Sequence, residues 1–162
     1  MKQIIFFYLV IFFNLISFSQ NKLTLEDIWI TYKYFPHAID DIQSSNDGKT
    51  YTILTLRSKI ERYGYNKGKF IETVFSLSDI KGKDTPQSIY RYDFSKDETK
   101  ILFSSNVEHV YRHSYLANFY VWNIKAKKLL PVYTKAKQQA ASFSPDGKKV
   151  AFVFDNNLYI NN

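Results

Sequence analysis

The fold is decided by a short motif that the chain repeats, most clearly as SPDGKKVAF at residues 144–152. Two further copies read SNDGKTYTIL at residues 45–54 and SKDETKILF at residues 95–103. The aspartates at the same place in successive copies lie 50 and 49 positions apart. A period near 50 residues, with one turn and one strand in each repeat, is typical of the blades of a propeller.

Each copy predicts a tight turn that leads into a strand. The aspartates Asp47, Asp97 and Asp146 can accept hydrogen bonds from backbone N–H groups that follow them, and glycine tolerates the positive φ of such turns. The apolar residues after each turn alternate with others, as in a strand half buried in a sheet. Because further strands follow each turn, we expect an all-β fold, a partial β-propeller of about three four-stranded blades out of the roughly four to eight that close a ring.

Composition favours the same fold and excludes several functions. The 162 residues include 14 Phe, 13 Tyr and 2 Trp, but only 5 Gly and 4 Pro, and aromatic residues favour pleated, half-buried surfaces. Since the chain has no cysteine, it has no disulfide framework, thiolate zinc site or cysteine nucleophile. The net charge of +7 is spread along the chain, which argues against a nucleic-acid partner.

The first nineteen residues have the features of a signal peptide. Lys2 supplies positive charge, residues 4–16 are apolar except for Asn14, and residues 17–19 offer small side chains to a signal peptidase. The apolar stretch is shorter than the roughly 20 residues that cross a membrane. We therefore expect cleavage after residue 19 and export to the periplasm or the extracellular space, with an uncleaved N-terminal membrane anchor as the alternative.

The mature chain, residues 20–162, is expected to begin with a short helix at residues 23–30. Thr24 is placed to cap the N-terminus of this helix, and Asp27 follows three residues later as a carboxylate in the first turn. The helix therefore precedes the first predicted blade.

Few residues could carry chemistry of their own. The histidines His37, His109 and His113 are not spaced for a shared helical face and have no clustered carboxylates beside them, so we expect neither a metal site nor another cofactor. The sequence contains no Gly-x-Ser-x-Gly elbow and no glycine-rich phosphate loop. The pair Asp40-Asp41 is interpreted as solvated surface.

One stretch, YRHSYLANF at residues 111–119, stands out. It follows a predicted strand at residues 101–105, which we expect to end in a loop. An arginine flanked by aromatic rings can be held rigid by stacking, so that its planar guanidinium is free to donate hydrogen bonds. The alternative is a surface arginine, Arg112, that pairs with Glu108 and packs on Tyr111.

Seven segments carry a resemblance to a known family. They are LEDIW at 25–29, FSLS at 75–78, IYRYDFS at 89–95, YRHSY at 111–115, YVWNI at 120–124, FSPDGKKVAF at 143–152 and DNNLYI at 155–160. In this order they resemble the N-terminal part of the propeller domain of the dipeptidyl peptidase IV family of serine exopeptidases. The resemblance covers nearly the whole mature chain, and the YRHSY segment is its most specific part.

The resemblance implies an eight-bladed propeller that caps a C-terminal α/β-hydrolase domain with a Ser-Asp-His triad. Such enzymes act on peptides with a free N-terminus and release dipeptides, preferentially after Pro or Ala. The arginine that matches Arg112 contacts the carbonyl oxygen of the residue before the scissile-site residue, so Arg112 is the implied substrate-binding residue. Glu108, His113 and Tyr115 are then expected to support the loop that carries Arg112.

The family's double-Glu motif, which binds the α-amino group, and its hydrolase domain are not in this sequence. The resemblance therefore implies an N-terminal fragment without catalytic residues, inactive alone, whose full-length form is a possible homodimer. Three alternatives stay open. They are a non-enzymatic exported propeller that binds a protein or peptide partner, an exported β protein whose turns resemble the family by convergence, and a relative that releases tripeptides.

Overall fold

The computed structural model describes residues 23–34, 39–82 and 85–162, so the predicted signal peptide and His37 lie outside the described residues. The chain divides into two units, Met1–Ala38 and Ile39–Asn162, and each is considered by itself. Among the described residues, no helix combines the length and apolar character needed to cross a membrane.

The first unit contains the short helix α2 (Leu25–Trp29). The hydroxyl of Thr24 accepts a hydrogen bond from the backbone N–H of Asp27 at 3.1 Å, and the carboxylate of Asp27 accepts one from the backbone N–H of Thr24 at 3.3 Å. These reciprocal bonds form a capping box and satisfy two N–H groups that a helix start leaves unpaired. The predicted cap is confirmed, and the helix is shorter than expected because Ile30 already forms its C-cap.

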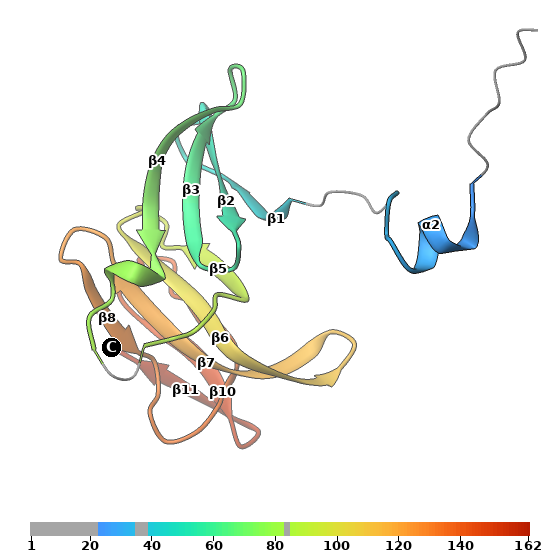
Figure 1. Cartoon of the computed structure of the whole chain (residues 1–162). Coiled ribbons are helices and arrows are strands. Elements are labelled where there is room, and N and C mark those ends of the chain that lie inside the picture. The colour runs from blue at the N-terminus through green and yellow to red at the C-terminus, as the bar shows by residue number, and fades with distance from the viewer. Residues whose placement is uncertain (1–22, 35–38, 83–84) are drawn as a thin grey trace, which may run out of the picture. The chain divides into compact units, whose positions relative to one another are not determined.

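The second unit consists of three antiparallel sheets that follow one another along the chain (Figure 1). The first sheet contains β1 (Asp40–Ser44), β2 (Thr50–Thr55), β3 (Lys59–Gly64) and β4 (Lys69–Ser76), followed by the 3-10 helix η1 (Leu77–Asp79). The second contains β5 (Arg91–Phe94), β6 (Lys100–Tyr111), β7 (Ser114–Asn123) and β8 (Lys128–Pro131). The third contains β9 (Gln139–Phe143), β10 (Val150–Phe154) and β11 (Asn157–Asn161). The predicted all-β fold of about three propeller blades is confirmed.

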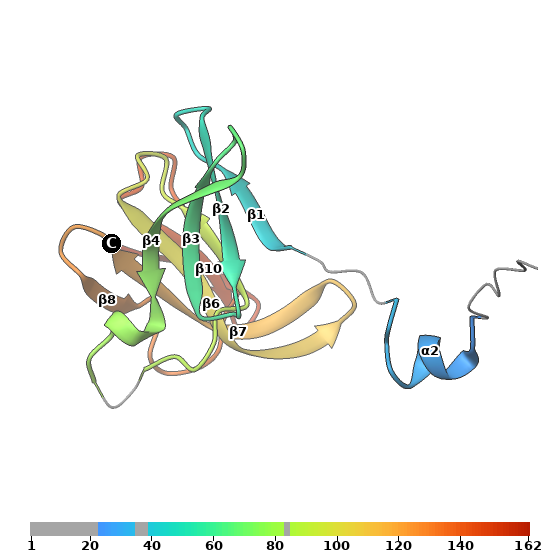
Figure 2. The same ribbon diagram turned by 45° about the horizontal axis from the view of Figure 1, so that its top comes forward.

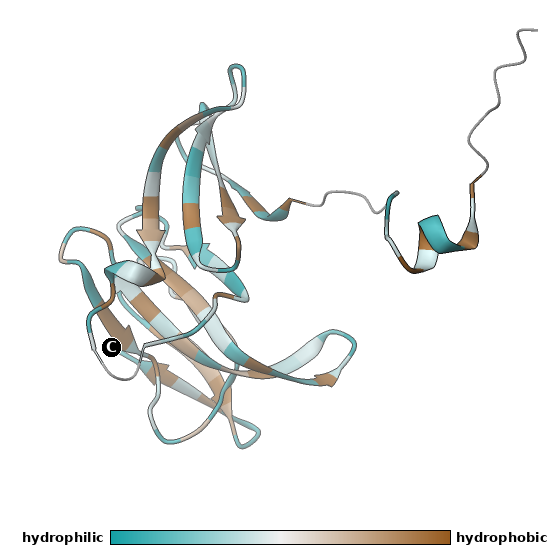
Figure 3. Cartoon of the chain, viewed as in Figure 1, coloured by the Kyte–Doolittle hydropathy of each residue, from teal (hydrophilic) through white to brown (hydrophobic). Residues whose placement is uncertain are grey.

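Two apolar cores hold the three sheets together, and strand β6 contributes to both. Ile101 and Phe103 lie in the core shared with the first sheet, whereas Leu102 lies in the core shared with the third. Successive side chains of a strand point to opposite faces, so one strand serves two interfaces. Figure 3 shows the resulting bands of apolar and polar residues along the strands.

Aromatic rings fill the first core. The ring centroid of Phe75, on β4, lies 5.4 Å from that of Phe103 and 4.9 Å from that of Trp122 on β7. Phe75 and Phe103 are both fully buried. Offset ring pairs at these distances add to the stabilisation that comes from burying apolar area.

The three repeated turns form as the sequence predicts. In each, the Oδ1 atom of the aspartate accepts a hydrogen bond from the backbone N–H two residues ahead, at 2.8 Å for Asp47, 3.2 Å for Asp97 and 3.1 Å for Asp146. The pKa of all three aspartates is lowered, chiefly by the backbone N–H of Lys49 for Asp47 and by the hydroxyl of Ser144 for Asp146, because these hydrogen bonds favour the ionised carboxylate. For Asp97 the largest cause of the lowered pKa is the hydroxyl of Ser95, followed by the backbone N–H of Thr99.

The residue after each aspartate takes a left-handed conformation. Gly48 and Gly147 have φ values of 63° and 65°, and Glu98 takes the same place in the second turn with φ 54°. Glycine adopts this conformation without strain, whereas other residues lose about 1–2 kcal/mol there. The structure offsets this strain at Glu98, because its carboxylate accepts a hydrogen bond of 2.6 Å from the backbone N–H of Asn46 in the first turn.

The equivalent turns of neighbouring sheets touch one another. The side-chain amide of Asn46 donates to the carbonyl of Lys96 at 2.7 Å, and the ammonium of Lys100 donates to the carbonyl of Gly147 at 2.8 Å. Figure 2 shows the yellow-green turn between β5 and β6 beside the red turn between β9 and β10. Contacts between turns therefore add to the two cores in joining successive sheets.

Two glycine variants separate backbone strain from these contacts. A Cβ atom at Gly147 would lie 3.1 Å from the Cβ of Ser95, whereas a Cβ at Gly48 meets no atom within 4 Å. We expect Gly48→Ala to lower the free energy of unfolding by about 1 kcal/mol and Gly147→Ala by about twice that, because only the second also pushes two turns apart. Urea denaturation of both variants measures the difference, and equal losses would contradict it.

A pH series tests the hydrogen bonds to Asp97. Because its pKa in the folded protein lies below the ordinary value of 3.8, ionised Asp97 stabilises the fold above about pH 4, and this contribution is lost as the pH falls through the lowered pKa. We expect Asp97→Asn to be less stable than the wild type at pH 7, and the gap to shrink below pH 4. Urea midpoints at pH 7, 4 and 3 measure it, and a gap that stays constant would rule out the carboxylate's role.

Candidate functional site

The stretch around Arg112 forms the tip of a long hairpin. Strand β6 has 12 residues and runs on to Tyr111, so the prediction that the strand ends near Ser105 and enters a loop is wrong. Strand β7 pairs with β6 along this extension, and a register shift after Ser105 accommodates Asn106 at φ 52°. Arg112 and His113 form the two-residue turn at the tip, and the hairpin projects beyond the rest of its sheet (Figure 1).

The hairpin tip forms one wall of an open cavity of about 430 Å³, called here the arginine cavity. Its lining contains three arginines, two histidines, two tyrosines and two aspartates, contributed by the first and second sheets. They are Arg57, Arg91, Arg112, His109, His113, Tyr90, Tyr115, Asp40 and Asp41. Three of the four residues predicted for the site, Arg112, His113 and Tyr115, therefore come together at one cavity.

Tyr90 is the centre of an aromatic cluster in the wall of this cavity. Its ring lies 5.2 Å from the ring of Tyr115 and 5.6 Å from that of His109, both in edge-to-face geometry. On the same ring, the guanidinium carbon of Arg57 lies 5.5 Å from the centroid, which is cation–π distance. Tyr115 on β7 and His109 on β6 thus both pack on Tyr90 near the hairpin tip, and the role of Tyr115 in supporting Arg112 stays a prediction.

Glu108 does not line the arginine cavity. Its carboxylate pairs with the ammonium of Lys137 at 3.1 Å, in the segment that leads to β9. Among the ion pairs of the described residues there is none between Glu108 and Arg112, and Tyr111 is 78% exposed. Arg112 is exposed, as the alternative of a surface arginine expects, but the expected pair with Glu108 is wrong because Glu108 pairs with Lys137.

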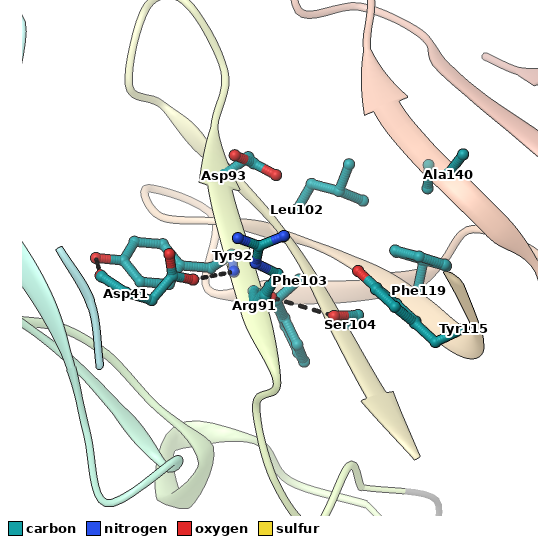
Figure 4. A pocket seen from close by; sticks show the side chains of 11 residues that line it. Asp41, Arg91, Tyr92, Asp93, Leu102, Phe103, Ser104, Tyr115, Phe119 and Ala140 are labelled. Carbon is teal, nitrogen blue, oxygen red and sulfur yellow. Dashed lines mark hydrogen bonds between the residues drawn. The ribbon is translucent and has the colours of Figure 1, made fainter. Parts of the chain in front are cut away.

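Asp41 does more than the solvated-surface interpretation allows, and that interpretation is wrong for it. Its Oδ2 atom accepts a hydrogen bond from the backbone N–H of Tyr92 at 3.1 Å, and its carbonyl accepts one from the hydroxyl of Tyr92 at 3.0 Å. Figure 4 shows Asp41 beside Tyr92 in a second cavity, of about 240 Å³, that adjoins the first through Asp41, Arg91 and Tyr115. Asp41 therefore fastens the first sheet to the second, while Asp40 is exposed as predicted.

Burial changes the titration of two groups beside Asp41. Desolvation raises the pKa of Tyr92, so its hydroxyl stays protonated and can donate to Asp41. Desolvation also raises the pKa of Asp93, and the negative charge of Asp41 adds to that rise, whereas Arg91 opposes it. Arg91 thus partly offsets the rise in the pKa of Asp93.

No sequence pattern singles out Arg57 or Tyr90 as a site residue. Tyr90 belongs to the IYRYDFS segment but has no chemistry of its own, and Arg57 lies in a turn without the usual Asn-Gly signal. Both reach the site through the packing of one sheet on another. Within the described residues, no group of three or more His, Asp or Glu side chains is placed to hold a metal ion.

Consecutive antiparallel sheets of four, four and three strands, packed in chain order with a cavity where the first two meet, define part of a β-propeller. The profile of the dipeptidyl peptidase IV (DPP IV) N-terminal region matches residues 95–162. The crystal structure of Porphyromonas gingivalis dipeptidyl peptidase 4 superposes with a TM-score of 0.74 and 33% identity, over 87% of this chain and 20% of that one.

Two fungal relatives agree with this match. A probable dipeptidyl peptidase 4 of Aspergillus fumigatus is 31% identical over 146 residues, which cover 88% of this chain and 18% of the relative. A probable dipeptidyl-aminopeptidase B of Tuber melanosporum is 27% identical over 155 residues, which cover 86% and 16%. The chain is the N-terminal region of a protein of the dipeptidyl peptidase IV family. It spans a fifth or less of the length of these relatives.

Removing the ring of Tyr90 tests whether it supports the hairpin. We expect Tyr90→Ala to speed amide hydrogen exchange in the outer part of β6 and β7 by roughly tenfold, because contacts to Tyr115 and His109 are lost. Tyr90→Phe keeps the ring and should leave exchange unchanged. Exchange read by mass spectrometry measures both variants, and an unaffected hairpin in Tyr90→Ala would show that the cluster does not support it.

Proposed function

We propose that this chain forms one wall of the substrate cleft of an exported serine peptidase that releases N-terminal dipeptides, preferentially after Pro or Ala. The observation that carries the proposal is Arg112, which lies at the tip of a hairpin, lines a cavity and belongs to the YRHSY segment. The names of the relatives support the activity, and the apolar stretch at residues 4–16 supports export to the periplasm or beyond.

Arg112 is suited to binding a peptide backbone. A guanidinium donates two parallel hydrogen bonds and so fixes both the position and the direction of a carbonyl group. None of the four ion pairs among the described residues involves Arg112, so no carboxylate competes for these donors there. Holding the carbonyl of the N-terminal residue aligns the next peptide bond for attack, which lowers the entropic part of the barrier.

The chemical step itself needs groups from elsewhere in the complete protein. His113 and Ser114 are neighbours at one hairpin end, so they cannot adopt the geometry in which a histidine takes a proton from a serine and a carboxylate orients the histidine. In the proposed enzyme, a C-terminal hydrolase domain supplies the triad, and this chain supplies substrate orientation.

The test uses the protein encoded by the complete reading frame. We expect it to release the dipeptide from Gly-Pro-p-nitroanilide, and Arg112→Ala to lower kcat/KM by roughly 10- to 100-fold, because a charge-assisted hydrogen-bond pair to the substrate is lost. Arg112→Lys should retain an intermediate rate, since it keeps the charge but not the planar fork.

The matched control is Lys125→Ala, which removes a cation from the exposed turn at the other end of β7 and should leave kcat/KM unchanged. No release of dipeptide, or equal rates for the wild type and Arg112→Ala, would contradict the proposed function.

A further inference from the structure

Arg57 lies in a turn whose backbone is unusual for its residues. Three residues, Leu56 to Ser58, connect β2 to β3, and the two central residues of the turn, Leu56 and Arg57, have φ values of 50° and 51°. Turns of this type normally carry Asn-Gly, because both central residues have positive φ. Leu56 is also 87% exposed, so it gains no burial in return. Strained backbone positions of this kind are concentrated at functional sites, so the conformation of Arg57 suggests a functional role.

Three contacts fix Arg57 in place. The N–H of Ser58 donates to the carbonyl of Thr55 at 3.1 Å and closes the turn, and the carbonyl of Arg57 accepts a hydrogen bond from the N–H of Ile89 at 2.7 Å. The guanidinium lies over the ring of Tyr90. Because the backbone and the face of the guanidinium are both held, its N–H groups are presented at a defined place in the arginine cavity.

The charges of the arginine cavity leave Arg57 without a carboxylate partner. None of the four ion pairs among the residues that the structure describes involves Arg57, Arg91 or Arg112. Of the two aspartates in the lining, Asp41 already accepts the N–H of Tyr92, and Asp40 takes part in none of these four ion pairs. Arg57, which packs on Tyr90, and Arg112, at the hairpin tip, are therefore two cations lining one cavity, and neither forms an ion pair with a described carboxylate.

We propose that Arg57 and Arg112 together select peptides whose N-terminal residue carries a carboxylate side chain. The inference rests on the proposed function, in which Arg112 holds the backbone carbonyl of that residue. Arg57 lines the same cavity from the neighbouring sheet, and it binds the side-chain carboxylate of aspartate or glutamate. A guanidinium matches the planar geometry of a carboxylate, which gives such a pair both strength and direction.

The test compares two substrates of the same shape, Glu-Pro- and Gln-Pro-p-nitroanilide, with the protein from the complete reading frame. We expect kcat/KM to be about tenfold higher for the glutamate substrate, a preference that weakens at high salt. In Arg57→Gln the ratio of the two rates should fall to near one, while the rate on the glutamine substrate stays within about twofold of wild type. That retained rate shows that the variant is folded.

Lys125→Gln is the matched control, because it removes one positive charge at the far end of β7, and its glutamate preference should equal that of the wild type. A glutamate-to-glutamine ratio of kcat/KM near one in the wild type, or an unchanged ratio in Arg57→Gln, would overturn this inference. If the protein still hydrolysed Gly-Pro-p-nitroanilide, the proposed function would be unaffected by that result. No hydrolysis of any of these substrates would overturn both.

Discussion

Burial of the second sheet on both faces is the constraint on which the rest of the structure depends. Ile101 and Phe103 pack toward the first sheet and Leu102 toward the third, so β6 cannot shift by one residue without exchanging the two cores. This fixes the register of β6 and β7 within the packed region. The outer part of the hairpin has no such core, but it extends from strands whose register is already set. The packing of the core therefore also determines the position of Arg112.

The site is therefore a product of the interface between two sheets and not of any one element. Asp41 and Arg57 come from the first sheet, whereas Tyr90 and Arg112 come from the second. The hydrogen bonds from Tyr92 to Asp41 and from Ile89 to Arg57 keep the two sides at a fixed separation. For the proposed function, a cleft built in this way would need little rearrangement to receive an extended peptide, which would reduce the entropy lost on binding.

How much of the structure the sequence could predict depends on how far apart in the chain the interacting residues lie. The turns at Asp47 and Asp146 depend on hydrogen bonds to residues two positions ahead, so a local motif is enough to predict them. The outer part of β6 is mostly exposed, and pairing with β7 together with the packing of His109 on Tyr90 keeps it extended, which no local pattern reveals. Likewise, Asp40 and Asp41 are indistinguishable in sequence, because only the approach of Tyr92 from another sheet separates their roles. The resemblance of the YRHSY segment identified Arg112, whereas Arg57 required the packed structure.

The contacts between equivalent turns have a geometric consequence for the larger assembly. Asn46 reaches from one turn to the next, and Lys100 reaches onward to the third, so each blade is joined to its successor at the same corner. In a repeating architecture, a small fixed rotation from each unit to the next determines the curvature of the whole. The close approach of Gly147 to Ser95 then sets the spacing between two blades at this corner. A bulkier residue at position 147 would open the angle between the blades and change the radius on which a ring could close.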